Sequence, residues 1–131
     1  MALVPPIRDE DAPAEVRAVF DDIRATRRSD YVNDFWRYLA NDPATLRRMW
    51  AQTKEVMAAG ALDPMVKELI YLAVSITNNC DYCIHTHHAS ARAKGMNDAM
   101  FAEAMAVTAL ANANNRLANG YRMDVDERYR G

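Results

Sequence analysis

The chain has 131 residues, a length that suits one compact domain. Its 16 basic and 18 acidic side chains nearly balance, at a formal net charge of −2, which argues against the basic field of a nucleic-acid-binding protein. The mean hydropathy is −0.33, and no apolar run approaches the roughly 20 residues that cross a bilayer. The first residues show no basic segment followed by an apolar one, so we expect no secretory signal, no membrane contact and a cytoplasmic protein.

The sequence predicts an all-α protein, a single-domain bundle of about six helices. Only four glycines are present, and no run alternates apolar and polar residues as a half-buried strand would. Residues 1–11 hold two prolines and three acids and are expected to form an extended leader. We expect the helical domain over residues 12–121 and a frayed polar tail over 122–131.

Start and stop signals place the first three helices. Apolar residues at helical spacing predict helices over about 13–27 and about 30–40. Asp42-Pro43 predicts the start of a third helix, because aspartate caps a helix and proline suits its first position. This helix is expected to run to Ala58.

Asp63-Pro64 predicts the start of a fourth helix by the same signal. No residue between Glu68 and Cys80 is charged, and the apolar residues of this segment lie all round the helix. Such a pattern is typical of a central, buried helix.

Two further helices are expected in the last third of the chain. One starts at residue 79 or 80, after the break at Asn78-Asn79, and runs to about residue 94, where Gly95 stops it. A long one covers about 99–118 and ends at Gly120. Glu103 is its only charged residue before Arg116, so we expect it to be largely buried, in the core or between subunits.

Both cysteines of the chain lie in one motif, Cys80-Asp-Tyr-Cys83. A bridge between residues this close closes a tiny loop and stabilises little, so a disulfide scaffold is not indicated. In a reducing compartment such a pair indicates redox chemistry or metal binding.

A histidine lies at helical spacing from both thiols. Cys80, Cys83 and His87 stand at i, i+3 and i+7, on one face of one helix. An imidazole four residues from Cys83 can accept the thiol proton. If Asn79 caps the helix, Cys80 lies in the first turn, where the helix dipole favours a thiolate. Both thiols therefore have a route to activation, and the sequence does not decide which one attacks first.

Glu68 is the acid in this otherwise uncharged stretch, on a polar stripe with Tyr71 and Ser75. If the chain turns back at Asn78-Asn79, the two helices run antiparallel and Glu68 reaches the level of His87. A buried carboxylate orients an imidazole and raises its basicity. We therefore hypothesise a proton relay Glu68–His87–Cys83 with Cys80 as the disulfide partner. The alternative is a structural ion pair between Glu68 and Lys67 or an arginine.

Other polar residues near the motif are expected to play lesser parts. Tyr82, Ser75 and Tyr71 are candidates for the pocket wall, although each suits simple packing as well. His85 lies two residues from both Cys83 and His87, which turns it away from their face, and His88 is expected to pack against a neighbour or a subunit.

The pattern Glu68, eleven residues, Cys80-x-x-Cys83-x-x-x-His87 resembles the signature of the alkyl hydroperoxidase D and carboxymuconolactone decarboxylase-like family. The flanking segments 62–70 and 89–95 agree with it, and the similarity covers roughly 43–111. Trp36 and Asp42-Pro43 suit the peroxidase-related branch.

The resemblance implies an all-helical fold that assembles into trimers or hexamers. It also implies peroxide reduction through a reversible disulfide, with no metal, haem or flavin. The family roles transfer to Cys80 and Cys83 as the redox pair and to Glu68 and His87 as the relay. Well-studied peroxidases of this type have a histidine where this chain has Tyr82, a departure that bears on the strength of the relay.

The sequence thus predicts a dithiol peroxidase that reduces hydroperoxides, organic ones above all, and that is reset by an external dithiol, either a reductant protein or a lipoyl-type donor. Two alternatives remain open. One is a lyase acting on a lactone acid with His87 and Glu68. The other is a zinc-binding or redox-sensing helical module, in which Cys80, Cys83 and His87 would be joined by Glu68, His88 or a water.

Overall fold

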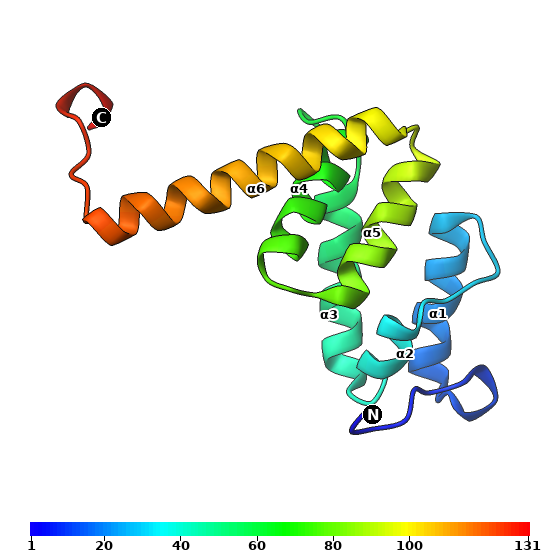
Figure 1. Ribbon diagram of the computed structural model, residues 1–131. Coiled ribbons are helices and arrows are strands. Elements are labelled where there is room, and N and C mark those ends of the chain that lie inside the picture. The colour runs from blue at the N-terminus through cyan, green and yellow to red at the C-terminus, as the bar shows by residue number, and fades with distance from the viewer. The chain divides into compact units, whose positions relative to one another are not determined.

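The computed structural model describes residues 1–131 and is all-helical, with six α-helices and two short 3₁₀ turns (Figure 1). The helices fall into two compact units, Met1–Ala58 and Ala59–Gly131. The domain bounds expected from sequence, 12–121 between a leader and a tail, stay a prediction. None of the helices is long and apolar enough to cross a membrane.

The first unit holds α1 (Ala14–Arg27), α2 (Asp34–Leu39) and α3 (Pro43–Met57). Its core is built from the apolar faces of all three helices, with Trp36 and Trp50 in edge-to-face contact at 5.2 Å between ring centroids. The predicted start of α3 is confirmed, because the Asp42 side chain accepts a hydrogen bond from the backbone N–H of Ala44.

The second helix is shorter than the predicted 30–40. The carbonyl of Asp30 accepts a hydrogen bond from Arg24, and that of Val32 accepts one from Arg37. Arginine side chains thus satisfy carbonyls that a longer helix would bond to its own backbone, so the helix starts only at Asp34. A 3₁₀ turn, Asp9–Asp11, lies within the predicted leader.

The second unit holds α4 (Pro64–Thr77), α5 (Asp81–Ala93), α6 (Asp98–Tyr121) and the 3₁₀ turn Glu127–Tyr129. A three-residue turn folds α5 back along α4, and α6 packs on α4 and then projects beyond both helices (Figure 1). Gly95 ends α5 with φ +102°, a left-handed conformation that glycine adopts without strain. Gly120, in contrast, lies inside α6, which ends only at Tyr121.

The fourth helix is not the buried, central helix that its sequence predicted, and the last helix is not buried within this chain; its burial between subunits stays a prediction. Ile70 and Val74 of α4 are 51% and 53% exposed, and Val107 and Leu110 of α6 are 66% and 62% exposed. The buried residues are Glu68, Leu72 and Ser75 on α4 and Thr108 on α6. Within this unit only two other helices are present to cover each helix, so much of the apolar surface of α4 and α6 faces outward.

Candidate active site

The turn between α4 and α5 positions the two cysteines. Asn79 adopts a left-handed conformation, with φ 56°, which asparagine tolerates better than most residues. The backbone N–H of Cys80 then donates to the carbonyl of Ser75 at 3.0 Å, which closes the reversal. The helix consequently begins one residue later than predicted: Cys80, not Asn79, is the N-cap of α5.

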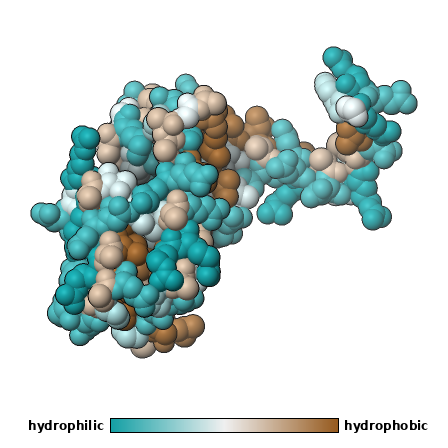
Figure 2. Space-filling model, turned by 180° about the vertical axis from the view of Figure 1, so that it is seen from behind, coloured by the Kyte–Doolittle hydropathy of each residue, from teal (hydrophilic) through white to brown (hydrophobic).

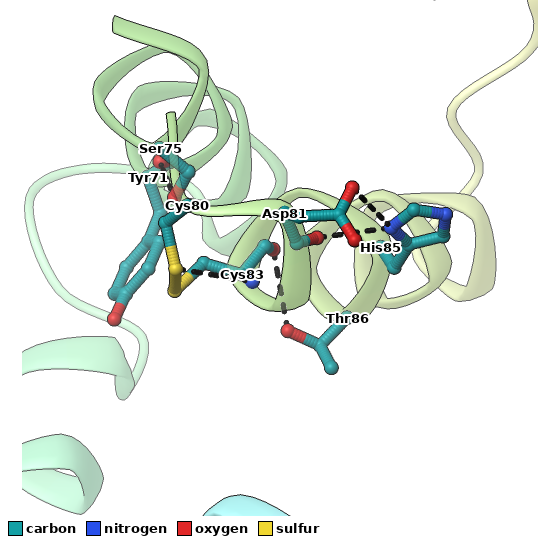
Figure 3. The surroundings of a disulfide bond; sticks show 7 residues. All are labelled: Tyr71, Ser75, Cys80, Asp81, Cys83, His85 and Thr86. Atoms are coloured by element: carbon teal, nitrogen blue, oxygen red, sulfur yellow. Dashed lines mark hydrogen bonds and ion pairs between the residues drawn. A yellow bond between two sulfur atoms is a disulfide. The ribbon is translucent and has the colours of Figure 1, made fainter. Parts of the chain in front are cut away.

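Cys80 and Cys83 form a disulfide, with an S–S distance of 2.08 Å and Cα atoms 5.3 Å apart (Figure 3). The Sγ of Cys80 also accepts a hydrogen bond from the backbone N–H of Cys83 at 3.3 Å. A sulfur at the N-cap therefore faces an otherwise unpaired amide of the first turn, the setting in which a thiolate is stabilised once the bridge is reduced.

The predicted contact between Glu68 and His87 is present. Glu68 is only 4% exposed, and its Oε2 lies 2.7 Å from Nδ1 of His87. Because the two helices run antiparallel, a residue in the first half of α4 meets one at the middle of α5, as counting outward from the turn predicted.

Two further side chains hold the other carboxylate oxygen. Oε1 of Glu68 accepts hydrogen bonds from Oγ of Ser90 at 2.7 Å and from Nζ of Lys94 at 3.0 Å. Lys94 also donates to Oγ of Ser90 at 2.9 Å. The ion pair of Glu68 is therefore made with Lys94, a residue that the sequence analysis did not single out.

These contacts determine the charge of Glu68. Burial raises the pKa of this carboxyl, but the hydrogen bonds from His87, Ser90 and Lys94, together with the charge of Lys94, outweigh burial and lower the pKa to about 2. Glu68 is thus ionised at neutral pH and can only accept hydrogen bonds. The proton of the His87 ring consequently sits on Nδ1, and in the neutral imidazole Nε2 is the nitrogen that can accept a proton.

The imidazole of His87 is held by a ring contact on its face as well as by the hydrogen bond between its Nδ1 and Glu68. The Tyr71 ring stacks on it with centroids 3.5 Å apart and an angle of 20° between the planes. Ser75 is buried and donates its hydroxyl to the carbonyl of Tyr71, so it shapes the turn from within α4. Tyr82 is 41% exposed in the first turn of α5.

The two other histidines have partners of their own. Nδ1 of His85 lies 2.9 Å from the carbonyl of Asp81, on the part of α5 that faces away from the sulfurs (Figure 3). His88 contacts the Phe101 ring edge-on at 4.8 Å, and its Nε2 accepts a hydrogen bond from Arg92. Neither takes part in the Glu68–His87 contact.

Ser90 and Lys94 follow His87 at i+3 and i+7, so they continue the helix face that carries Cys80, Cys83 and His87. Extending that face along the helix was the signal that could have found both residues. No group of three or more His, Cys, Asp and Glu residues is arranged to hold a metal ion, and both sulfurs are joined to each other.

Comparison with known proteins agrees with this fold. The crystal structure described as the alkylhydroperoxidase AhpD core from Rhodospirillum rubrum is similar, with a TM-score of 0.95 and 54% identity, over 98% of this chain and 97% of that one. A protein of Paracoccus denitrificans, described as uncharacterized protein 4 in the cox locus, is 39% identical over 75 residues, 52% of this chain and 68% of that protein. The predicted all-α fold of six helices is confirmed as AhpD-like, with a close cysteine pair. Residues 43–123 match the carboxymuconolactone decarboxylase family, and the chain belongs to it.

Proposed function

We propose that this protein is a dithiol peroxidase that reduces organic hydroperoxides through Cys80 and Cys83. The observation that carries the proposal is a disulfide at the start of the helix on which His87 is held by a buried, ionised Glu68. The similarity to a structure described as an alkylhydroperoxidase core supports it.

The proposed cycle begins with the reduced pair. One thiolate attacks a peroxide oxygen, the O–O bond breaks, and the alkoxide takes a proton to leave as an alcohol. The attacking sulfur is now a sulfenic acid, and the second thiol condenses with it to give the Cys80–Cys83 disulfide and one water. Hydroperoxide and two thiols are thus converted into alcohol, water and disulfide.

An external dithiol then reduces the disulfide by exchange and is itself oxidised. A reductant protein or a lipoyl-type donor has this chemistry. Because the cycle needs a supply of reduced dithiol, we place the protein in the cytoplasm.

His87 handles the protons in this proposal. Its Nε2 accepts the thiol proton and returns it to the alkoxide, while Glu68 stabilises the imidazolium that forms in between. Either cysteine suits the attack: Cys80 lies at the N-cap, where a thiolate is favoured, and Cys83 lies four residues before His87.

We also propose that the active form is an oligomer of this chain, a trimer or a hexamer. Val107, Leu110, Leu117 and Tyr121 are all more than half exposed, and they recur along α6 at three-, seven- and four-residue intervals. Such a seam pairs with another helix, and a second copy carries the same seam. Figure 2 shows hydrophobic surface at the base of the projecting helix. A mass by light scattering equal to one chain, 14.8 kDa, would contradict this part of the proposal.

The test of the peroxidase proposal is a thiol count. The protein is first reduced with dithiothreitol, freed of it, and exposed briefly to one equivalent of cumene hydroperoxide; free thiols are then counted under denaturing conditions. We expect both thiols to disappear and a dithiol to restore them. The matched Cys80→Ser and Cys83→Ser variants should form no intramolecular disulfide.

The family name supports a second candidate, lyase chemistry on a lactone acid by His87 and Glu68. This reaction does not need the thiols, so turnover of a carboxymuconolactone by the double variant Cys80→Ser, Cys83→Ser would support it. Thiols that stay unreacted with peroxide would remove the peroxidase proposal, and one zinc per chain in the reduced protein would point to a metal-binding module instead.

A further inference from the structure

Lys94 reaches into the site from the end of α5. It is the C-cap residue of this helix, and its side chain is 38% exposed. Its Nζ nevertheless contacts both Oε1 of Glu68 and Oγ of Ser90, at 3.0 and 2.9 Å. A lysine at a helix C-terminus interacts favourably with the last carbonyls wherever its side chain points. The stability of the helix therefore does not explain why this side chain points inward.

The carboxylate of Glu68 thus stands between two basic groups. Oε2 faces Nδ1 of His87, and Oε1 faces the ammonium group of Lys94. A carboxylate that faced the imidazole alone would favour the imidazolium strongly, and a ring that is already protonated before the reaction cannot accept the proton of the thiol. A cation on the far oxygen reduces this effect.

We propose that Lys94 is a positioning residue, which clamps the far oxygen of Glu68 so that the near oxygen faces His87, and whose charge limits how strongly Glu68 favours the imidazolium. The role rests on the proposed function, in which His87 both accepts and returns a proton. From α4, the groups that face His87 are Glu68 and Tyr71. On its own helix, His87 has Cys83, Ser90 and Lys94 on the same face. From α6, the one residue in an ion pair is Asp98, and its partner is Arg92, not His87.

The test is an NMR titration of the histidine rings in the oxidised protein, where no thiol titrates alongside them. The chain has only three histidines, so His85 and His88, which contact neither Glu68 nor Lys94, serve as internal references. In Lys94→Met we expect the His87 midpoint to move up by about 0.5 to 1 pH unit, the effect of removing one partly exposed charge. The references should stay in place.

Two further variants separate charge from structure. Lys94→Arg keeps the cation and should restore the His87 midpoint to within about 0.2 pH unit of the unchanged protein. Lys54→Met removes a lysine whose ion pair is with Asp22 of the first unit, and should move no histidine. A His87 midpoint that is unchanged in Lys94→Met, or that moves together with His85 and His88, would overturn the proposal.

A second measurement links this coupling to the reaction. The rate of thiol loss with cumene hydroperoxide is followed against pH in the unchanged protein and in Lys94→Met, and we expect the profile to shift with the His87 titration. An unshifted profile beside a shifted titration would overturn the catalytic part of the inference. If the unchanged protein loses no thiols at all, the proposed function fails, while the titration still decides whether Lys94 acts on His87.

Discussion

Replacing Glu68 by glutamine tests the energetics of the site directly. The side chain is 4% exposed, and its pKa falls from an ordinary 4.5 to about 2. At roughly 1.4 kcal/mol per pH unit, this fall corresponds to about 3 kcal/mol of folding stability. Glutamine keeps the shape and one acceptor oxygen but loses the charge. We therefore expect the free energy of unfolding of Glu68→Gln at pH 7 to be about 3 kcal/mol lower than that of the unchanged protein.

The pH dependence of this loss follows from the direction of the pKa change. A carboxyl whose pKa is lowered in the folded state contributes its full stability above the unfolded value, near 4.5, and loses that stability as pH falls towards 2. Asp9 and Asp22 also have lowered pKa values, caused first by hydrogen bonds from Arg24 and Lys54 respectively, and lose stability in the acid range too. Only the difference between the unchanged protein and Glu68→Gln isolates Glu68.

Urea unfolding followed by circular dichroism measures this difference. The free energy of unfolding is measured for both proteins at pH 7, 5, 4 and 3. The difference between them should be near its full value at pH 7 and 5 and should shrink towards zero at pH 4 and 3. Glu103→Gln, at an exposed position on α6, is the matched control and should differ little from the unchanged protein at any pH. A gap for Glu68→Gln that stays constant from pH 7 to pH 3 would refute the assignment of the stability to the charge.

Three further predictions concern the fold and the assembly. Gly95→Ala should lower the free energy of unfolding by about 1 kcal/mol in urea titrations, because φ is +102° there, while the nearest side-chain atom is 4.0 Å away and causes no clash. Reduction of the Cys80–Cys83 disulfide should leave helicity by circular dichroism unchanged, since the bridge spans only three residues; unfolding on reduction would show a structural role. Leu110→Asp should reduce the mass by light scattering to that of one chain and keep the helicity, because Leu110 is 62% exposed; an unchanged oligomer would place the subunit contact elsewhere.

Local signals in the sequence were sufficient for most helices and for the centre of the site. The aspartate–proline pairs at 42–43 and 63–64 begin α3 and α4, because the cap and the fixed proline φ act within one turn of the chain. Helical spacing places Cys80, Cys83 and His87 on one face, and equal distances from the turn bring Glu68 to His87. Each of these inferences depends on residues close in sequence or on one short reversal.

Contacts between elements decided the rest. The start of α2 depends on arginines of α1 and α2 that bind loop carbonyls, and hydrogen bonds from a side chain to a loop carbonyl leave no periodic pattern in the sequence. Lys94 lies on the right face of α5, but only the packing of α4 against α5 shows that it bends towards Glu68. The apolar character of α4 and α6 is plain from the sequence. An apolar composition indicates that a helix surface is covered, but it does not identify the element or subunit that covers it. The tertiary structure shows that much of this surface is left uncovered by the chain itself.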